Sequence, residues 1–311
     1  MGREEHLRWE RDNAQWAAIA AALSALFTIA AGLYFRSKVT GSPDDNVEGI
    51  ILVHDHKGDL LVSSILQAFG TALLAGPLYY LFRATRARRE QLPAPIRYLV
   101  IGAPLVAAVF SIVHQVQLNG VSDKVVKLLP LPPDMAKQLV NDKLGEGGVV
   151  AVSGIGTAAG LGIAFMFIIV SLNAMRAGLL SRFMGILGII VGVLLVIPLQ
   201  GNLPVVQVFW MGALAALFLD RWPQGRGPAW ASGTEIPWPS AADKRDALMG
   251  GDGADAPGGR RPAGRVASSP DVALDEPDDV VEAPAHTGEP ARPRPSATHP
   301  RSKKRKRKRR G

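Results

Sequence analysis

Long apolar stretches alternate with short polar segments from residue 17 to residue 219. A helix crosses the hydrocarbon core of a membrane, which is about 30 Å thick, with roughly 20 apolar residues. The stretches that approach this length and contain no Asp, Glu, Lys or Arg cover residues 17–35, 65–82, 98–118, 149–175, 183–199 and 203–219. The pattern therefore predicts an all-α fold, a polytopic transmembrane helical bundle of six spans.

Arginine is concentrated in two of the short segments between these stretches. Residues 83–97 hold five Arg and residues 176–182 hold two, whereas the longer segments 36–64 and 119–148 have fewer bases for their length. Because basic loops stay in the cytoplasm, we expect a multi-pass protein of the plasma membrane with both termini cytoplasmic. The expected organisation is a cytoplasmic N-terminal segment (1–16), a transmembrane domain (17–220), a juxtamembrane segment rich in Trp and Pro (221–240) and a disordered tail (241–311).

Glycines at four-residue steps in two of the predicted spans indicate close helix packing. They are Gly156 and Gly160 in one span, and Gly188 and Gly192 in the next. In lipid, small residues let two helix backbones approach, and the resulting van der Waals contact holds the helices together. We expect these glycines to face another helix of the same subunit. A dimer contact or a glycine-lined ligand path is the alternative.

The predicted spans lack Asp, Glu, Lys and Arg, and this bears on function. Ion-coupled carriers and voltage sensors place charged groups at membrane depth. Two functions stay open: a non-catalytic membrane scaffold or interaction protein, and a carrier or sensor for an uncharged or apolar ligand. A polar cavity containing Gln67, Asn173 or Gln207 would favour the carrier, and a solid bundle packed on its glycines would favour the scaffold.

The sequence contains no nucleotide-binding, zinc-protease or serine-hydrolase motif, so we expect no catalytic residues and no cofactor.

The two longer polar segments carry further local signals. In 36–64, His54, His56 and Asp59 are weak candidates for metal ligands, with the two histidines on one face of an extended segment. A metal site needs three or four ligands in a fixed geometry, so we expect no metal here, and Asp59 is expected to cap the following helix. Segment 119–148 is expected to form two short amphipathic helices that lie on the outer membrane face or cap the bundle.

Three tryptophans follow the last predicted span, at Trp222, Trp230 and Trp238. Tryptophan is enriched at the headgroup boundary because its ring is apolar and its N–H is polar. The prolines between the three residues prevent the last span from continuing as a helix. We therefore expect these tryptophans to anchor the chain at the membrane interface.

The net charge of +8 comes from the C-terminal end of the chain. Without residues 301–311, which hold nine bases, the chain has 26 bases and 27 acids. We expect anionic lipid headgroups to be the partner of this polybasic run, at about 1 kcal/mol for each base. A solubilising tail is the alternative, and nucleic acid is an unlikely partner. The run consists of Lys303, Lys304, Arg305, Lys306, Arg307, Lys308, Arg309 and Arg310.

Two stretches of sequence resemble a known pattern. One runs from Leu172 to Gly188, and the other runs from Arg221-Trp222-Pro223 through Trp230 to Pro237-Trp238-Pro239-Ser240. They are similar to an uncharacterised bacterial family of six-span integral membrane proteins that carry a domain of unknown function. The resemblance extends over about residues 10–240. It implies a helical membrane bundle and supplies no activity, ligand or catalytic residue.

Overall fold

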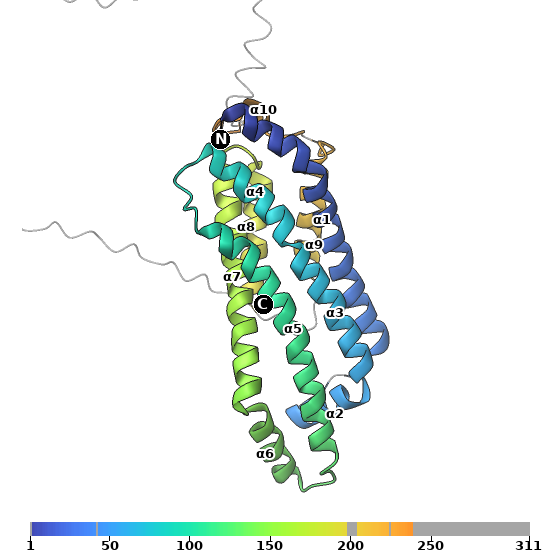
Figure 1. Cartoon of the computed structure of the whole chain (residues 1–311). Coiled ribbons are helices and arrows are strands. Elements are labelled where there is room, and N and C mark those ends of the chain that lie inside the picture. Colours follow the sequence, from blue (N-terminus) through green and yellow to red (C-terminus); the bar gives the residue numbers. More distant parts are fainter. Residues whose placement is uncertain (1, 42, 198–203, 224, 239–311) are drawn as a thin grey trace, which may run out of the picture. The chain divides into compact units, whose positions relative to one another are not determined.

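All the regular structure of the described residues is helical (Figure 1). The computed structural model describes residues 2–41, 43–197, 204–223 and 225–238. The expected all-α class is confirmed for this part of the chain, and the expected tail lies outside it. The helices are α1 (Arg3–Lys38), α2 (Asn46–Asp55), α3 (Lys57–Leu73), α4 (Ala75–Arg88), α5 (Ile96–Val126), α6 (Pro133–Leu144), α7 (Gly147–Arg176), α8 (Arg182–Val196), α9 (Val205–Phe218) and α10 (Pro228–Ser232).

Four helical segments of the described residues are long and apolar enough to cross a membrane, as in an integral membrane protein. They are α1, the pair α3–α4 over Lys57–Arg88, α5 and α7. Helices α8 and α9 are apolar but shorter, with 15 and 14 residues. At about 1.5 Å per residue, each is shorter than the ~30 Å hydrocarbon core. Residues 198–203, which the sequence assigns to the ends of the last two spans, lie outside the described residues.

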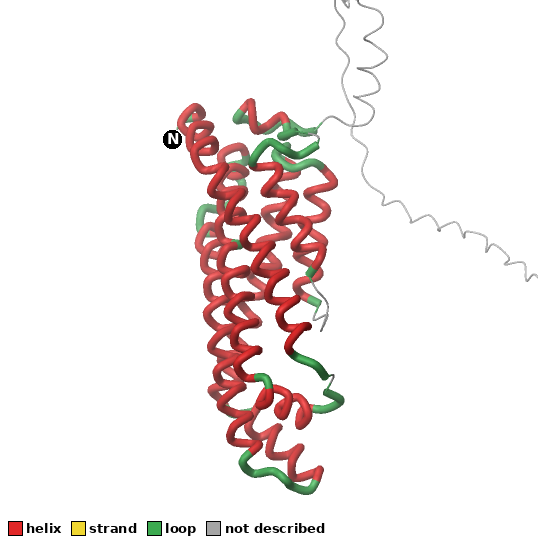
Figure 2. The backbone as a smooth tube through the Cα atoms, turned by 90° about the vertical axis from the view of Figure 1, so that its right-hand side faces the viewer, coloured by secondary structure: helices red, strands yellow, loops and turns green. Residues whose placement is uncertain are grey.

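The helices pack side by side in a ring. α3 lies against α1, α5 against α3, α7 against α5, α8 against α7 and α9 against α8, and α9 returns to α1. Successive helices of the ring run in opposite directions (Figure 1), and the ring appears as a long bundle from the side (Figure 2). The start of α1, the α4–α5 and α7–α8 connections and α10 therefore lie together at one end, which we call the α10 end. α2 and α6 lie at the opposite end, the α6 end (Figure 1).

Proline explains the break between α3 and α4. Pro77 has no N–H to donate to the carbonyl of Leu73, four residues earlier, and its ring crowds that carbonyl. Helix α3 ends at that residue, and Leu74 separates it from α4. From the sequence, Pro77, Pro104 and Pro198 are each expected to kink or end a helix. The break before Pro77 confirms this expectation there, whereas α5 continues through Pro104. Pro198, also expected to end a helix, lies outside the described residues.

The α6 end is more helical than the sequence indicated. The Asp45 carboxylate accepts hydrogen bonds from the backbone N–H groups of Val47 and Glu48, both at 3.0 Å, and starts α2. The hydrogen bonds from Glu48 and Val47 hold the pKa of Asp45 below its ordinary value. The expectation of an extended segment at 54–56 is wrong, because α2 continues to Asp55. The expected separate helix after residue 119 is also wrong, because α5 continues to Val126.

A small second core explains this order at the α6 end. Val121 and Val125 of α5 are buried together with Ile50 of α2, Val140 of α6 and Val149 of α7. Burying these side chains gives α2 and α6 an apolar surface on which to pack. The expected amphipathic helix that opens at Pro132-Pro133 is confirmed as α6.

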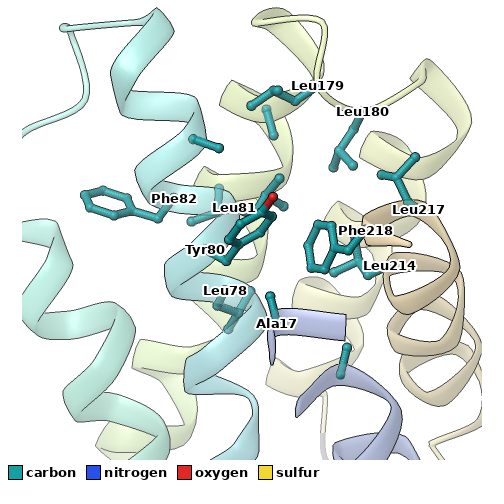
Figure 3. Packing of buried hydrophobic residues seen from close by; sticks show 14 of the residues in the cluster. Ala17, Leu78, Tyr80, Leu81, Phe82, Leu179, Leu180, Leu214, Leu217 and Phe218 are labelled. Carbon is teal, nitrogen blue, oxygen red and sulfur yellow. The ribbon is translucent and has the colours of Figure 1, made fainter. Parts of the chain in front are cut away.

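The main core lies among α1, α4, α7, α8 and α9 and includes the α7–α8 turn (Figure 3). Alanines such as Ala17 and Ala21 leave the core face of α1 small, so larger side chains of α4 and α9 can lie close to it. The rings of Tyr80 and Phe218 meet edge to face, with their centroids 4.7 Å apart. This core links the helices near the α10 end.

Candidate functional site

The metal candidates at the α6 end pair with separate carboxylates. His54 Nδ1 lies 3.1 Å from an Asp123 carboxylate oxygen on α5, which the Lys57 ammonium also contacts. His56 Nδ1 instead lies 3.8 Å from Asp59, which accepts a 2.8 Å hydrogen bond from the Tyr34 hydroxyl. The described residues contain no group of three or more His, Cys, Asp or Glu side chains placed to hold a metal ion. These contacts tie α2 and α3 to their neighbours.

A cavity of about 360 Å³, whose lining is more apolar than polar, lies between α1, α3 and α5. Gln67 lines it, together with Thr28, Ser63 and Gln115. Asn173 donates instead to the Ile169 carbonyl within its own helix, at 2.9 Å. The structure thus places one of the three amides of the carrier hypothesis, Gln67, at a cavity. Pro204, which precedes α9, also borders this cavity.

The packing glycines differ sharply from one another. A Cβ at Gly188 would clash with Ser171 Oγ of α7 and lie 2.9 Å from the Trp210 ring of α9. A Cβ at Gly192 would lie 2.7 Å from the Ala164 carbonyl oxygen of α7. These two glycines therefore allow α7 and α8 to approach closely.

The other two expected packing glycines lie in a looser contact. The nearest atom to a Cβ at Gly156 would be Phe110 Cβ, at 3.8 Å, which is an ordinary contact. Among the described residues, no atom outside the backbone of its own helix lies within 4 Å of a Cβ at Gly160, so they show no close packing there. Gly160 shares the face of α7 that carries Ala164 and Ser171, because it lies four and eleven residues before them. Helix α8 ends at Val196, about one turn after Gly192 packs on Ala164, so it reaches little beyond this contact. A glycine pair in the sequence does not show how far along the helix its neighbour extends.

A buried ion pair joins α1 to α4 at the α10 end. The Arg88 guanidinium donates to both carboxylate oxygens of Glu10, at 2.5 and 2.9 Å. The two side chains are only 1% and 4% exposed, respectively. Arg88 also donates to the carbonyls of Ala84, at 2.8 Å, and of Ala229 in α10, at 3.0 Å. This bidentate geometry satisfies both charges inside the protein.

An aromatic cluster surrounds the ion pair. Trp230 stacks on Tyr80 with an interplanar angle of 14° and donates a 2.9 Å hydrogen bond to the Leu179 carbonyl. The Tyr80 hydroxyl donates to the Glu10 carbonyl oxygen at 2.9 Å. The expectation that Trp230 anchors at the membrane interface is therefore wrong, since its side chain is buried in the core. Trp222 is also partly buried against this core.

The segment after α9 folds back over the α7–α8 turn. The Arg226 guanidinium contacts the carbonyls of Leu217 and Phe218 and so satisfies the C-terminal end of α9. Gly178 has a φ of +81°, and a Cβ there would clash with the Ile236 carbonyl oxygen. The Trp238 ring lies beside Gly227 in the same fold. The described part of the expected juxtamembrane segment 221–240 therefore covers the α10 end of the bundle.

Sequence reasoning missed the Glu10–Arg88 pair. Arg88 belongs to the basic segment 83–97, and the number of bases there was explained by topology alone. Glu10 lies among acidic and basic residues that gave no reason to single it out. A signal that could have identified it is its helical spacing from the alanine face: Glu10, Ala14, Ala17, Ala18 and Ala21 share one face of α1.

Comparison with known proteins gives no relative. No protein-family model, no curated protein and no solved structure matches this chain.

Proposed function

We propose that this chain is a six-span protein of the plasma membrane that serves as a non-catalytic scaffold or interaction protein, with both termini in the cytoplasm. The observation that carries the scaffold proposal is the interlocked α10 end. There the buried Glu10–Arg88 pair joins α1, α4 and α10. A carrier has to open at both ends in turn, whereas a scaffold keeps a fixed surface. Helices α8 and α9 complete the ring of helices. This arrangement supports the proposal that they are the fifth and sixth spans.

Two further parts of the proposal rest on sequence. The polybasic run 303–310, outside the described residues, engages anionic lipid headgroups of the inner leaflet. Membership of the uncharacterised bacterial six-span family rests on the resemblance of residues 172–188 and 221–240. Neither part is needed for the scaffold argument.

A carrier or sensor for an uncharged ligand is the second candidate. The cavity that contains Gln67 favours it, because about 360 Å³ falls within the size range of small-molecule sites. Its lining combines amide and hydroxyl groups with apolar side chains and with Arg36.

Topology is testable because the chain contains no cysteine. A single cysteine at Gln91, between α4 and α5, and one at Gln138, on α6, each replace an exposed side chain. We expect a membrane-impermeant maleimide added to intact cells to label Gln138→Cys and to label Gln91→Cys only after lysis. Labelling of both variants in intact cells would contradict the orientation.

A third single-cysteine variant, Gln67→Cys, distinguishes the scaffold hypothesis from the carrier hypothesis. In a scaffold with a fixed α10 end, Gln67→Cys is expected to react only from the side on which Gln138→Cys reacts, over long labelling times. The interior is filled at the α10 end by the ion pair and the aromatic cluster. Right-side-out and inside-out vesicles provide the two directions of labelling. Reaction of Gln67→Cys from both sides would contradict the scaffold and favour the carrier.

A further inference from the structure

A second cavity lies at the α10 end, on the outside of the ion pair. It has a volume of about 920 Å³ and lies among the start of α1, the last turns of α4, the start of α5 and the turn at Gly233. Its lining includes five arginines, Arg3, Arg83, Arg86, Arg88 and Arg97. We call this cavity the arginine pocket.

The arginine pocket has an excess of positive charge. Its five arginines face two carboxylates, Glu10 and Glu90, so its formal charge is +3 with His6 neutral. Glu10 is bound to Arg88 by both oxygens, so these two charges offset each other. The other charged residues of the lining, with His6 neutral, are four arginines and the carboxylate of Glu90. The pocket therefore favours an anion.

Aromatic rings orient two of the guanidinium groups. Arg83 lies over the Trp9 ring, 4.0 Å from its centroid, and Arg97 lies over the Tyr98 ring at 4.6 Å. Stacking holds the flat guanidinium while its N–H groups stay directed along the plane, where they match the oxygens of a phosphate. A lysine ammonium has no equivalent arrangement. The chemistry of the pocket therefore suits a phosphate ester better than a simple carboxylate.

The depth of the pocket matches the headgroup layer of a membrane. Phe82, which ends the second predicted span, lines the pocket, and Arg97 lines it beside Tyr98, where the third span begins. The side chains of Tyr98 and Leu99 are 66% and 40% exposed, so the apolar surface that faces lipid starts next to the arginines. Tyr79, which also lines the pocket, adds to an apolar wall beside the charged groups. This combination fits a lipid that carries its phosphate at the boundary.

We propose that the arginine pocket binds the phosphate of an anionic phospholipid headgroup from the leaflet at the α10 end. The proposal rests on the membrane assignment but not on the scaffold or on the number of spans. It concerns bundle residues and is separate from the polybasic run. A soluble phosphate ester has the same chemistry and is the competing source of the ligand.

The test is lipid binding by the full-length chain in a neutral detergent, read as the shift of its melting temperature on titration. We expect phosphatidylglycerol to raise the melting temperature of the wild type and phosphatidylcholine to have little effect. In the pocket variant Arg86→Gln/Arg97→Gln, the half-saturating concentration of phosphatidylglycerol is expected to rise about tenfold, because two charge-assisted contacts are lost. Both side chains are partly exposed, so the fold is expected to be retained.

The matched control is Arg176→Gln/Arg182→Gln, which removes two exposed arginines from the α10 end but outside the pocket. It leaves the polybasic run unchanged and is expected to bind phosphatidylglycerol like the wild type. The first pocket variant could melt at a lower temperature than the wild type even without lipid. In that case the second pocket variant, Arg3→Gln/Arg86→Gln, provides the measurement.

The proposal would be overturned if phosphatidylglycerol had the same half-saturating concentration for both pocket variants and the control. Binding of inorganic phosphate or glycerol 3-phosphate as tightly as the lipid would overturn it in favour of a soluble ligand. The cysteine labelling of Gln67 is unaffected by either result.

Discussion

Replacing Glu10 by leucine is expected to lower the free energy of unfolding by about 3–5 kcal/mol, because a buried charge then loses its partner. The Arg88 side chain is 1% exposed and would keep only its contacts to the Ala84 and Ala229 carbonyls. Neutral acceptors do not balance a full charge away from water. Denaturation of the purified protein in detergent, followed by circular dichroism, measures the change.

Two comparisons make this result specific. Glu235→Leu removes the partner of Arg89 at the same end, but the Glu235 side chain is 41% exposed, so the loss is expected to stay below about 1 kcal/mol. The double variant Glu10→Leu/Arg88→Leu removes both buried charges and is expected to recover a large part of the lost stability. Similar losses for Glu10→Leu and Glu235→Leu would show that water reaches the ion pair.

Adding one methyl group at Gly188 is expected to destabilise the bundle by about 1–3 kcal/mol, as in an overpacked core. The new Cβ in Gly188→Ala would clash with Ser171 Oγ and press on Trp210. Neither neighbour moves easily. Ser171 and Trp210 are both fully buried, and the Trp210 N–H donates to the Met184 carbonyl at 2.9 Å. The melting temperature in detergent reports the effect.

The matched change at Gly160 has the opposite expected sign. The space around a Cβ there is open, and alanine is a better helix former than glycine by about 0.5–1 kcal/mol. Gly160→Ala should therefore melt at or above the wild-type temperature, while Gly188→Ala melts below it. A loss at Gly160 as large as that at Gly188 would contradict the open space around Gly160 among the described residues.

The location of the three tryptophans after α9 could not be predicted from the sequence. Trp222, Trp230 and Trp238 have the residue type and position of interface anchors, yet the Trp230 side chain, which belongs to α10, is buried in the main core. Exposed aromatic side chains occur instead at Trp16, which is 72% exposed, and Tyr98. The difference arises because the chain after α9 turns back at Asp220, whose φ is +58°. Aspartate adopts the left-handed conformation only occasionally, so an aspartate in the sequence does not predict such a turn.

The arginines of segment 83–97 show the same limit. Their number is a sequence property, and it was explained by orientation in the membrane. Their separate roles depend on position around α4. Arg88 points inward to Glu10, Arg89 pairs with Glu235, and Arg83 lies over Trp9. A helix turns by about 100° per residue, so adjacent arginines reach different neighbours, and these neighbours come from remote parts of the chain.

The sequence by itself determined the helical class, the long apolar helices and the break at Pro77. Each depends on local properties: apolar length, hydrogen bonding within one helix and the ring of proline. Tertiary structure alone decided that Gly188 and not Gly160 lies in a tight contact, that Glu10 is buried against Arg88, and that five arginines share one pocket. These features depend on which faces of different helices meet and on how far along each other the helices extend. In lipid, that choice follows from the close fit of side chains rather than from apolar character, which the helices all share.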